Sequence, residues 1–304
     1  MIHFRSIALP LVLVTTLLPS VTLAQPGASS EAARQRDTLP DPFLRARAAD
    51  EEDSDTTDDL MLLVEHDLFF AGLTTAVEIT DNAFRNNSEE NDVIGLAQFI
   101  FGAQTVVADK VDASALISVG GARYQDFDEL DSDFFTAGLQ AAVPFDGFRL
   151  GGVLAYDDFN ARGTGSDDLS QTRLGIFADK YWTLDNGVSL FALAQLEQVA
   201  ADPSDYELTR AQIRFGGSYA FTDRFTLNAG LSGKYETYDD YFEDFFNDSR
   251  DDFSLSTYLS ARYLIHPNVE ARVDLHYIHN ESSLDDFDYG STSLTPSITV
   301  AARF

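Results

Sequence analysis

From about residue 68 onward, apolar and polar residues alternate along the chain with a period of two. In residues 253–263, Phe253, Leu255 and Leu259 alternate with Ser254 and Ser260, and residues 111–120 and 225–236 repeat the pattern. Such a period places the two kinds of residue on opposite faces of a β-strand, each face in its own environment. The pattern therefore predicts an all-β protein.

Twelve such runs follow one another, and their number is even. Ten or fourteen strands stay open as alternatives, because strand ends read from a sequence are uncertain by two to four residues. The predicted strands cover residues 68–80, 92–106, 110–123, 132–144, 148–158, 170–182, 187–199, 206–221, 224–237, 252–265, 269–280 and 290–304.

The connections between these runs alternate between two kinds. Short, turn-like connections lie at 109–110, 144–147, 185–187, 222–223 and 266–268. Longer, acidic connections lie at 81–91, 124–131, 158–169, 200–205, 237–251 and 280–289. Transmembrane β-barrels have short periplasmic turns and long extracellular loops. We therefore predict that residues 60–304 form a transmembrane antiparallel up-and-down β-barrel of about twelve strands, with short periplasmic turns and long acidic extracellular loops.

The N-terminal residues carry an export pattern. Residues 1–24 combine a basic head, an apolar run over 7–18 and small residues before a cleavage position near Ala24, which is typical of a signal peptide. Residues 25–59 are acidic and poor in large apolar residues, and we expect a disordered periplasmic leader. The predicted location is the outer membrane of a Gram-negative bacterium.

Aromatic residues gather at both ends of the predicted strands, as in the interfacial belts of membrane barrels. Next to the short turns or at the same rim are Phe145, Phe148, Tyr181, Trp182, Phe221, Phe225, Tyr263 and Phe304. Next to the long loops are Tyr124, Tyr156, Tyr206, Tyr235, Phe253 and Tyr277.

The charge balance excludes several classes of function. The chain has 50 Asp+Glu against 20 Lys+Arg, a formal net charge of -30, and no cysteine. The phosphates of nucleic acids would repel such a chain. Disulfide scaffolds, cysteine nucleophiles and cysteine-zinc sites are excluded as well.

If the apolar strand faces meet lipid, the polar faces line the interior. A charged side chain at mid-membrane on the lipid side costs roughly 2–4 kcal/mol, which favours this orientation. The predicted pore-lining residues are Gln140, Arg149, Arg173, Asp179, Glu197, Arg210, Arg214, Lys234, Arg262, Glu270, Arg272, Asp274 and His276. These groups either line a water-filled pore or pair with one another and close the interior.

The long loops combine acidic and aromatic residues. The predicted acidic mouth consists of Asp126, Asp128, Asp131, Asp239, Asp240, Asp244, Asp285, Asp286 and Asp288. A mouth of one sign attracts cations and can collect divalent ions that bridge to lipopolysaccharide phosphates. The alternative is that these acids only keep the exposed loops soluble. No loop has the calcium-binding spacing of an EF-hand, so we predict neither a metal site nor a cofactor.

One polar cluster leaves an enzymatic alternative open. It consists of Asp274, His276, His279, Glu281, Ser282 and Ser283. His276 beside Asp274 could form a base with an orienting carboxylate, or it could belong to a hydrogen-bond network in the lumen. The spacing does not match known outer-membrane hydrolases, so we predict a protein that is not an enzyme.

The overall plan resembles that of Gram-negative outer-membrane β-barrel proteins of the porin type. Residues 80–85 (TDNAFR) resemble a short segment that such proteins carry at the end of the first strand, and the last strand ending in Phe304 resembles their assembly signal. The resemblance implies passive transport, with the barrel assembly machinery, periplasmic chaperones, membrane lipids and lipopolysaccharide as partners.

The predicted function is therefore a narrow porin-like channel for ions or small solutes, biased towards cations or neutral molecules. A closed barrel whose acidic, aromatic loops act in adhesion or envelope stabilisation is the first alternative. An outer-membrane hydrolase is the second. The sequence leaves the solute and the oligomeric state open.

Overall fold

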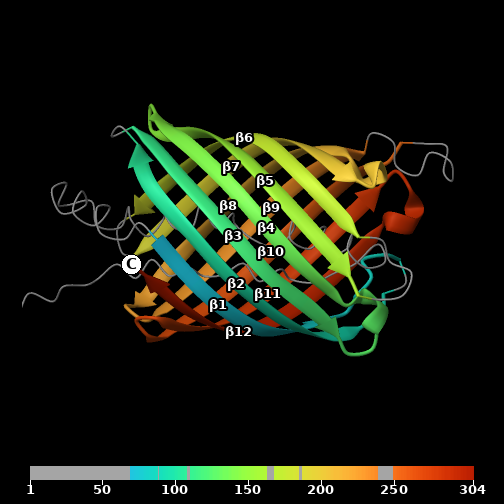
Figure 1. Cartoon of the computed structure of the whole chain (residues 1–304). Helices are drawn as coiled ribbons and strands as arrows, with labels where there is room; N and C mark the ends of the chain where they lie inside the picture. The colour runs from blue at the N-terminus through green and yellow to red at the C-terminus, as the bar shows by residue number, and fades with distance from the viewer. Residues whose placement is uncertain (1–68, 88, 108–109, 163–167, 185–186, 239–248) are drawn as a thin grey trace, which may run out of the picture.

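Twelve antiparallel strands close into one barrel in a computed structural model, which describes residues 69–87, 89–107, 110–162, 168–184, 187–238 and 249–304 (Figure 1). The strands are β1 (Phe69–Thr80), β2 (Asp92–Val107), β3 (Val111–Tyr124), β4 (Ser132–Phe145), β5 (Phe148–Ala161), β6 (Leu169–Leu184), β7 (Val188–Asp202), β8 (Leu208–Thr222), β9 (Phe225–Tyr238), β10 (Asp251–His266), β11 (Val269–Ser282) and β12 (Tyr289–Arg303). Within the described residues, the longer connections contain three short 3₁₀ turns, η2 (Asp128–Leu130), η3 (Ser204–Tyr206) and η4 (Asp285–Phe287).

Each strand pairs with its neighbours in sequence, and β1 pairs with β12 to close the sheet. The prediction of a closed antiparallel barrel of twelve strands is confirmed, and each strand end lies within three residues of its predicted position. The predicted signal peptide (1–24) and leader (25–59) lie outside the described residues.

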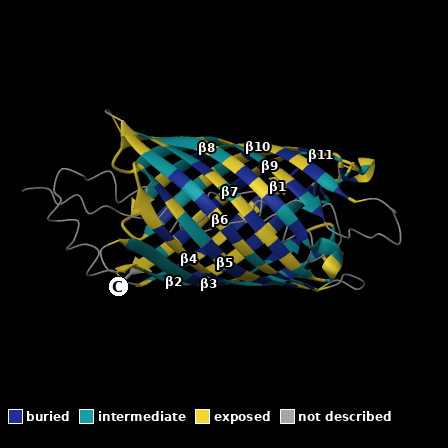
Figure 2. Ribbon diagram, turned by 90° about the horizontal axis from the view of Figure 1, so that it is seen from above, coloured by how far each residue is buried: buried dark blue, intermediate teal, exposed yellow. Residues whose placement is uncertain are grey.

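Burial alternates along the strands as the period of two requires, which gives the wall the chequered pattern of Figure 2. On β12, Ser293 and Thr295 are each 3% exposed, whereas Leu294 and Ile298 between and beyond them are 42% and 52% exposed. Inward groups are thus mostly polar and outward groups mostly apolar. A soluble protein rarely exposes so large an apolar surface, so the outer face is the surface that meets lipid.

The closing seam ends in an aromatic cluster at the rim with the short turns. Phe69 and Phe304 exchange two backbone hydrogen bonds of 3.0 Å, and the rings of Phe69 and Phe101 both lie within about 6.4 Å of the Phe304 ring. Phe304 therefore fastens the first strand to the last. Its recognition by the assembly machinery stays a prediction.

The two aromatic belts are present, with three exceptions. Trp182 and Phe221 are exposed on the outer face near the short turns. Tyr124, Tyr181 and Tyr206 do not face lipid, so their assignment to the belts is wrong. Tyr124 and Tyr181 share the inward parity of their strands, and Tyr206 lies in η3 against interior clusters.

Among the residues that the structure covers, no helix has the length and apolar character needed to cross a membrane.

Candidate functional site

The interior of the barrel has two chemically different walls. The first, here called the charged wall, is the inward face of β5 to β11. Its ionised side chains are Arg149, Asp157, Arg173, Asp179, Glu197, Arg210, Arg214, Lys234, Glu236, Asp252, Glu270, Arg272, Asp274 and, at the short-turn end, Arg262. The second, the hydroxyl wall, is the inward face of β12 and β1 to β4.

Arg210 is the centre of the charged wall. Its Nη1 donates to Glu197 Oε2 on β7 at 2.6 Å, and its Nε donates to Glu236 Oε1 on β9 at 2.8 Å. Glu236 also pairs with Lys234 at 2.9 Å, and Glu197 lies 3.7 Å from Arg173 Nη1. The register places Glu197, Arg210 and Glu236 directly opposite one another on neighbouring strands, which explains the pairing.

Further ion pairs flank this centre. Arg173 Nε donates to Asp157 Oδ2 at 2.6 Å. Towards the short turns, Arg149 Nε donates to Asp179 Oδ2 at 3.0 Å, and Arg149 Nη1 lies 3.6 Å from Asp112 of β3, with β4 between the two strands. On β10 and β11, Arg262 pairs with Glu270 at 3.5 Å and Arg272 with Asp274 at 2.5 Å. These pairs join residues of one strand, of adjacent strands or of strands two apart, so they run along the wall.

The hydroxyl wall carries mostly small polar groups, together with the inward carboxyl side chains of Glu78 and Asp112 and the amides of Gln98 and Gln140. β12 contributes five inward hydroxyls in succession, at Ser291, Ser293, Thr295, Ser297 and Thr299. Thr299 exchanges a 2.8 Å hydrogen bond with Thr74 of β1. Ser293 Oγ and Thr295 Oγ1 are buried and have no partner among the described residues. Since buried polar atoms rarely lack partners, Ser293 and Thr295 keep hydrogen-bonding capacity that the described protein atoms do not use.

Inward aromatic rings lie flat against the wall because glycines face them on neighbouring strands. A Cβ atom added to Gly230 would lie 2.3 Å from the ring of Tyr258, and one added to Gly151 would lie 2.2 Å from the ring of Phe177. Gly216 meets Phe191 in the same way, at 2.4 Å. The missing side chains let these rings lie over the backbone of the neighbouring strands.

The structure places all the predicted pore-lining residues on the inward face. Gln140 lies on the hydroxyl wall and the others on the charged wall. Sequence reasoning missed Asp157, Glu236 and Asp252, which complete the ion pairs. Each of these three follows the alternation of its predicted strand, so parity alone could have found them.

The predicted acidic mouth is only partly covered by the structure. Its exposed members are Asp126, Asp128, Asp285, Asp286 and Asp288, whereas Asp131 is half-buried and accepts a hydrogen bond from the Tyr124 backbone N–H at 2.8 Å. Asp239, Asp240 and Asp244 lie outside the described residues.

The candidate hydrolase cluster is divided between the two faces of the barrel. Asp274, His276 and Ser282 point inward, while His279 and Glu281 point outward and pair with each other at 3.4 Å. Asp274 accepts hydrogen bonds from Arg272, and Ser282 Oγ donates to Asp252 at 2.6 Å. Within the described part of the chain, no group of three or more histidines and acids is arranged to hold a metal ion.

No protein-family model matches the sequence. No curated protein matches it either. The fold is similar to that of an outer membrane channel from Pseudomonas putida F1, with a TM-score of 0.53 and 9% identity over 78% of this chain and 96% of the channel. The NanC porin (TM-score 0.45, 9% identity, 75% and 98% of the two chains) and the translocator domain of the autotransporter NalP from Neisseria meningitidis (0.45, 11%, 90% and 98%) are more distant.

At 9% identity, the likeness to the Pseudomonas channel shows the fold alone. It agrees with the closed strand order and the apolar outer face, which together show a β-barrel of the membrane-spanning kind.

Proposed function

We propose that this barrel is a narrow channel for passive diffusion of ions or small solutes across the outer membrane. The observation that carries the proposal is the direction of the interior side chains. The described ion pairs follow the wall, and the rings of Phe177, Phe191 and Tyr258 rest on glycines of the wall. Barrels of about eight strands are filled by side chains and those of 16 or more hold wide channels, so twelve strands favour a narrow path.

Cations and neutral solutes are the favoured cargo. Inside, most charges of the charged wall have a partner of opposite sign, so the wall itself presents little net charge. The exposed acids of the loops therefore dominate the field that an approaching ion meets. A solute with hydroxyl groups would also find hydrogen-bond partners on the hydroxyl wall.

The test is single-channel conductance of the refolded protein in a planar bilayer, with a salt gradient to obtain the reversal potential. Discrete steps with cation selectivity are the expected result, strongest at low ionic strength because salt screens the loop acids. Anion selectivity would contradict the bias, and the absence of steps from a verified folded barrel would contradict the channel.

A closed barrel with working surface loops is the competing function, and the extensive pairing of the interior charges favours it. A hydrolase is the weaker competitor, because its candidate residues are divided between two faces. A lipase and peptidase panel on the wild type and His276→Ala tests that idea, and we expect no activity from either protein.

A further inference from the structure

At the long-loop end of the barrel, η4 leaves the wall and reaches over the mouth. Phe287 of η4 is 8% exposed and belongs to one apolar cluster with Val199 of β7, Leu208 of β8 and Tyr238 of β9. In the barrel, β7 is four positions away from β11, the strand that leads into η4. Unlike the ion pairs of the charged wall, this contact spans part of the opening.

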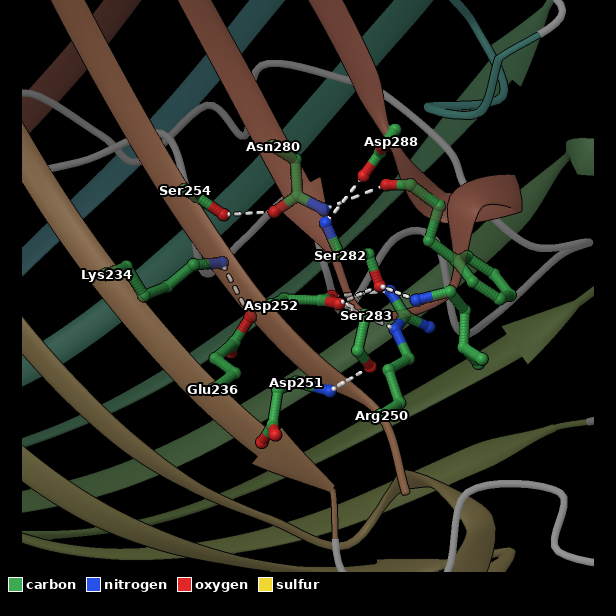
Figure 3. A network of polar contacts seen from close by, with 12 residues as sticks. Lys234, Glu236, Arg250, Asp251, Asp252, Ser254, Asn280, Ser282, Ser283 and Asp288 are labelled. Atoms are coloured by element: carbon green, nitrogen blue, oxygen red, sulfur yellow. Dashed lines mark hydrogen bonds and ion pairs between the residues drawn. The ribbon is translucent and has the colours of Figure 1, made fainter. Parts of the chain in front are cut away.

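Arg250 holds η4 in this position, and Figure 3 shows its guanidinium paired with Asp252. Its guanidinium carbon lies 3.8 Å from the ring centroid of Phe287 and 4.7 Å from that of Tyr238. Arg250 is itself 5% exposed. A desolvated guanidinium stacked on aromatic rings is strongly attracted to them. Arg250 therefore joins the loop ring of Phe287 to the wall ring of Tyr238.

Asp252 fixes the plane of that guanidinium. Arg250 Nε lies 3.0 Å from Asp252 Oδ1, and Arg250 Nη2 lies 2.6 Å from Asp252 Oδ2, which is a fork-like pairing. Asp252 also accepts a 2.6 Å hydrogen bond from Ser282 Oγ at the end of β11. Lysine could supply the charge but not this planar, two-point geometry.

Backbone contacts complete the attachment. The side chain of Asn280 donates to the carbonyl of Phe287 at 2.9 Å, and the N–H of Ser282 donates to Asp288 Oδ1 at 2.6 Å. The C-terminal end of η4 is thus tied to the end of β11, and Arg250 stacks on the ring of Phe287 at the same place.

We propose that Arg250 clamps η4 across the long-loop mouth and thereby sets the size limit for solutes that enter, an inference that rests on the proposed channel function. Arg250 acts here as a positioning residue, because it works through η4. Releasing the clamp should enlarge the entrance and leave the charged wall below it unchanged.

The test combines conductance with thiol labelling, which the absence of native cysteine makes selective. Leu284→Cys places one thiol beside η4. We expect Arg250→Ala to raise both the single-channel conductance and the uptake of larger neutral sugars into liposomes. We also compare how fast a hydrophilic maleimide labels Leu284→Cys with and without Arg250→Ala. Labelling should be about tenfold faster or more in the double variant, because it has lost the buried stacking of Arg250 on Phe287.

Arg123→Ala is the matched control. Arg123 also pairs with a carboxylate, that of Asp133, but on the outer face near the same rim, with a side chain 40% exposed. This variant should conduct and label like the wild type. Arg250→Lys should resemble Arg250→Ala, since it keeps only the charge. If Arg250→Ala fails to fold, Phe287→Ala releases the same contact from the loop side.

Equal labelling rates with and without Arg250 would overturn the clamp. Faster labelling with unchanged conductance and unchanged sugar uptake would overturn the size limit while the channel function stands. A folded wild-type barrel that passes no current would contradict the proposed function itself.

Discussion

The charged wall and the hydroxyl wall enclose the same lumen and make it polar in different ways. On the charged wall, long side chains such as Arg210 are held by carboxylates of neighbouring strands. On the hydroxyl wall, short groups such as Ser293 and Thr295 stay close to the backbone and leave atoms without protein partners. The difference teaches that a barrel interior can hold polar groups in two ways: long charged side chains need partners along the wall, whereas short hydroxyls stay beside the backbone.

The largest effect is expected from Arg210→Met, which removes the central cation of the charged wall. It leaves Glu197 and Glu236 buried without their shared counter-charge, and removing one partner of such a pair costs about 3–5 kcal/mol. Urea unfolding of the barrel in lipid vesicles should show a loss of this size. An unfolding free energy within about 1 kcal/mol of the wild type would mean that the wall does not depend on its pairs.

Gly230→Val tests whether the ring of Tyr258 must lie against the backbone at Gly230. The new side chain would collide with the ring of Tyr258, so the ring must turn into the lumen, and overpacking of this kind costs about 1–3 kcal/mol. Single-channel conductance should fall together with stability.

Gly233→Ala is the control on the same strand, because a Cβ atom there meets nothing within 4 Å. It should leave conductance and stability unchanged. Equal effects of the two substitutions would contradict the role of the rings.

The smallest effect is expected on the hydroxyl wall. Thr299→Val removes the hydrogen bond to Thr74, which is worth about 1 kcal/mol, and leaves the ion pairs intact. A double-mutant cycle with Thr74→Val, followed by urea unfolding, measures this bond directly. A coupling as large as the Arg210 effect would remove the distinction between the walls.

The barrel was predictable because two constraints act at every residue of a strand. The period of two divides residues such as Leu294 and Thr295 between the faces, and the cost of charge in lipid decides which face points inward. The inward position of Arg149 and Arg210 follows from these two constraints alone. The strand number comes from counting the alternating runs, with ten and fourteen left open, and closure comes from the alternation of short and long connections.

The pairing of charges was not predictable in the same way. Parity places Glu197 and Arg210 on one face, but only the register of β7 against β8 brings them opposite each other. The inward packing of Tyr124 and Phe287 was harder still to predict, because both side chains contact residues that are distant in sequence. Local patterns carry no information about such contacts.

The central claim is that the lumen between the two walls is an aqueous path, and cysteine modification during current recording tests it most directly. Thr295→Cys points inward from the middle of the hydroxyl wall, and Leu294→Cys is its outward neighbour. Addition of a charged methanethiosulfonate reagent should reduce the current through Thr295→Cys and leave that through Leu294→Cys unchanged. An unmodified Thr295→Cys, or a current that is insensitive to its modification, would contradict the account.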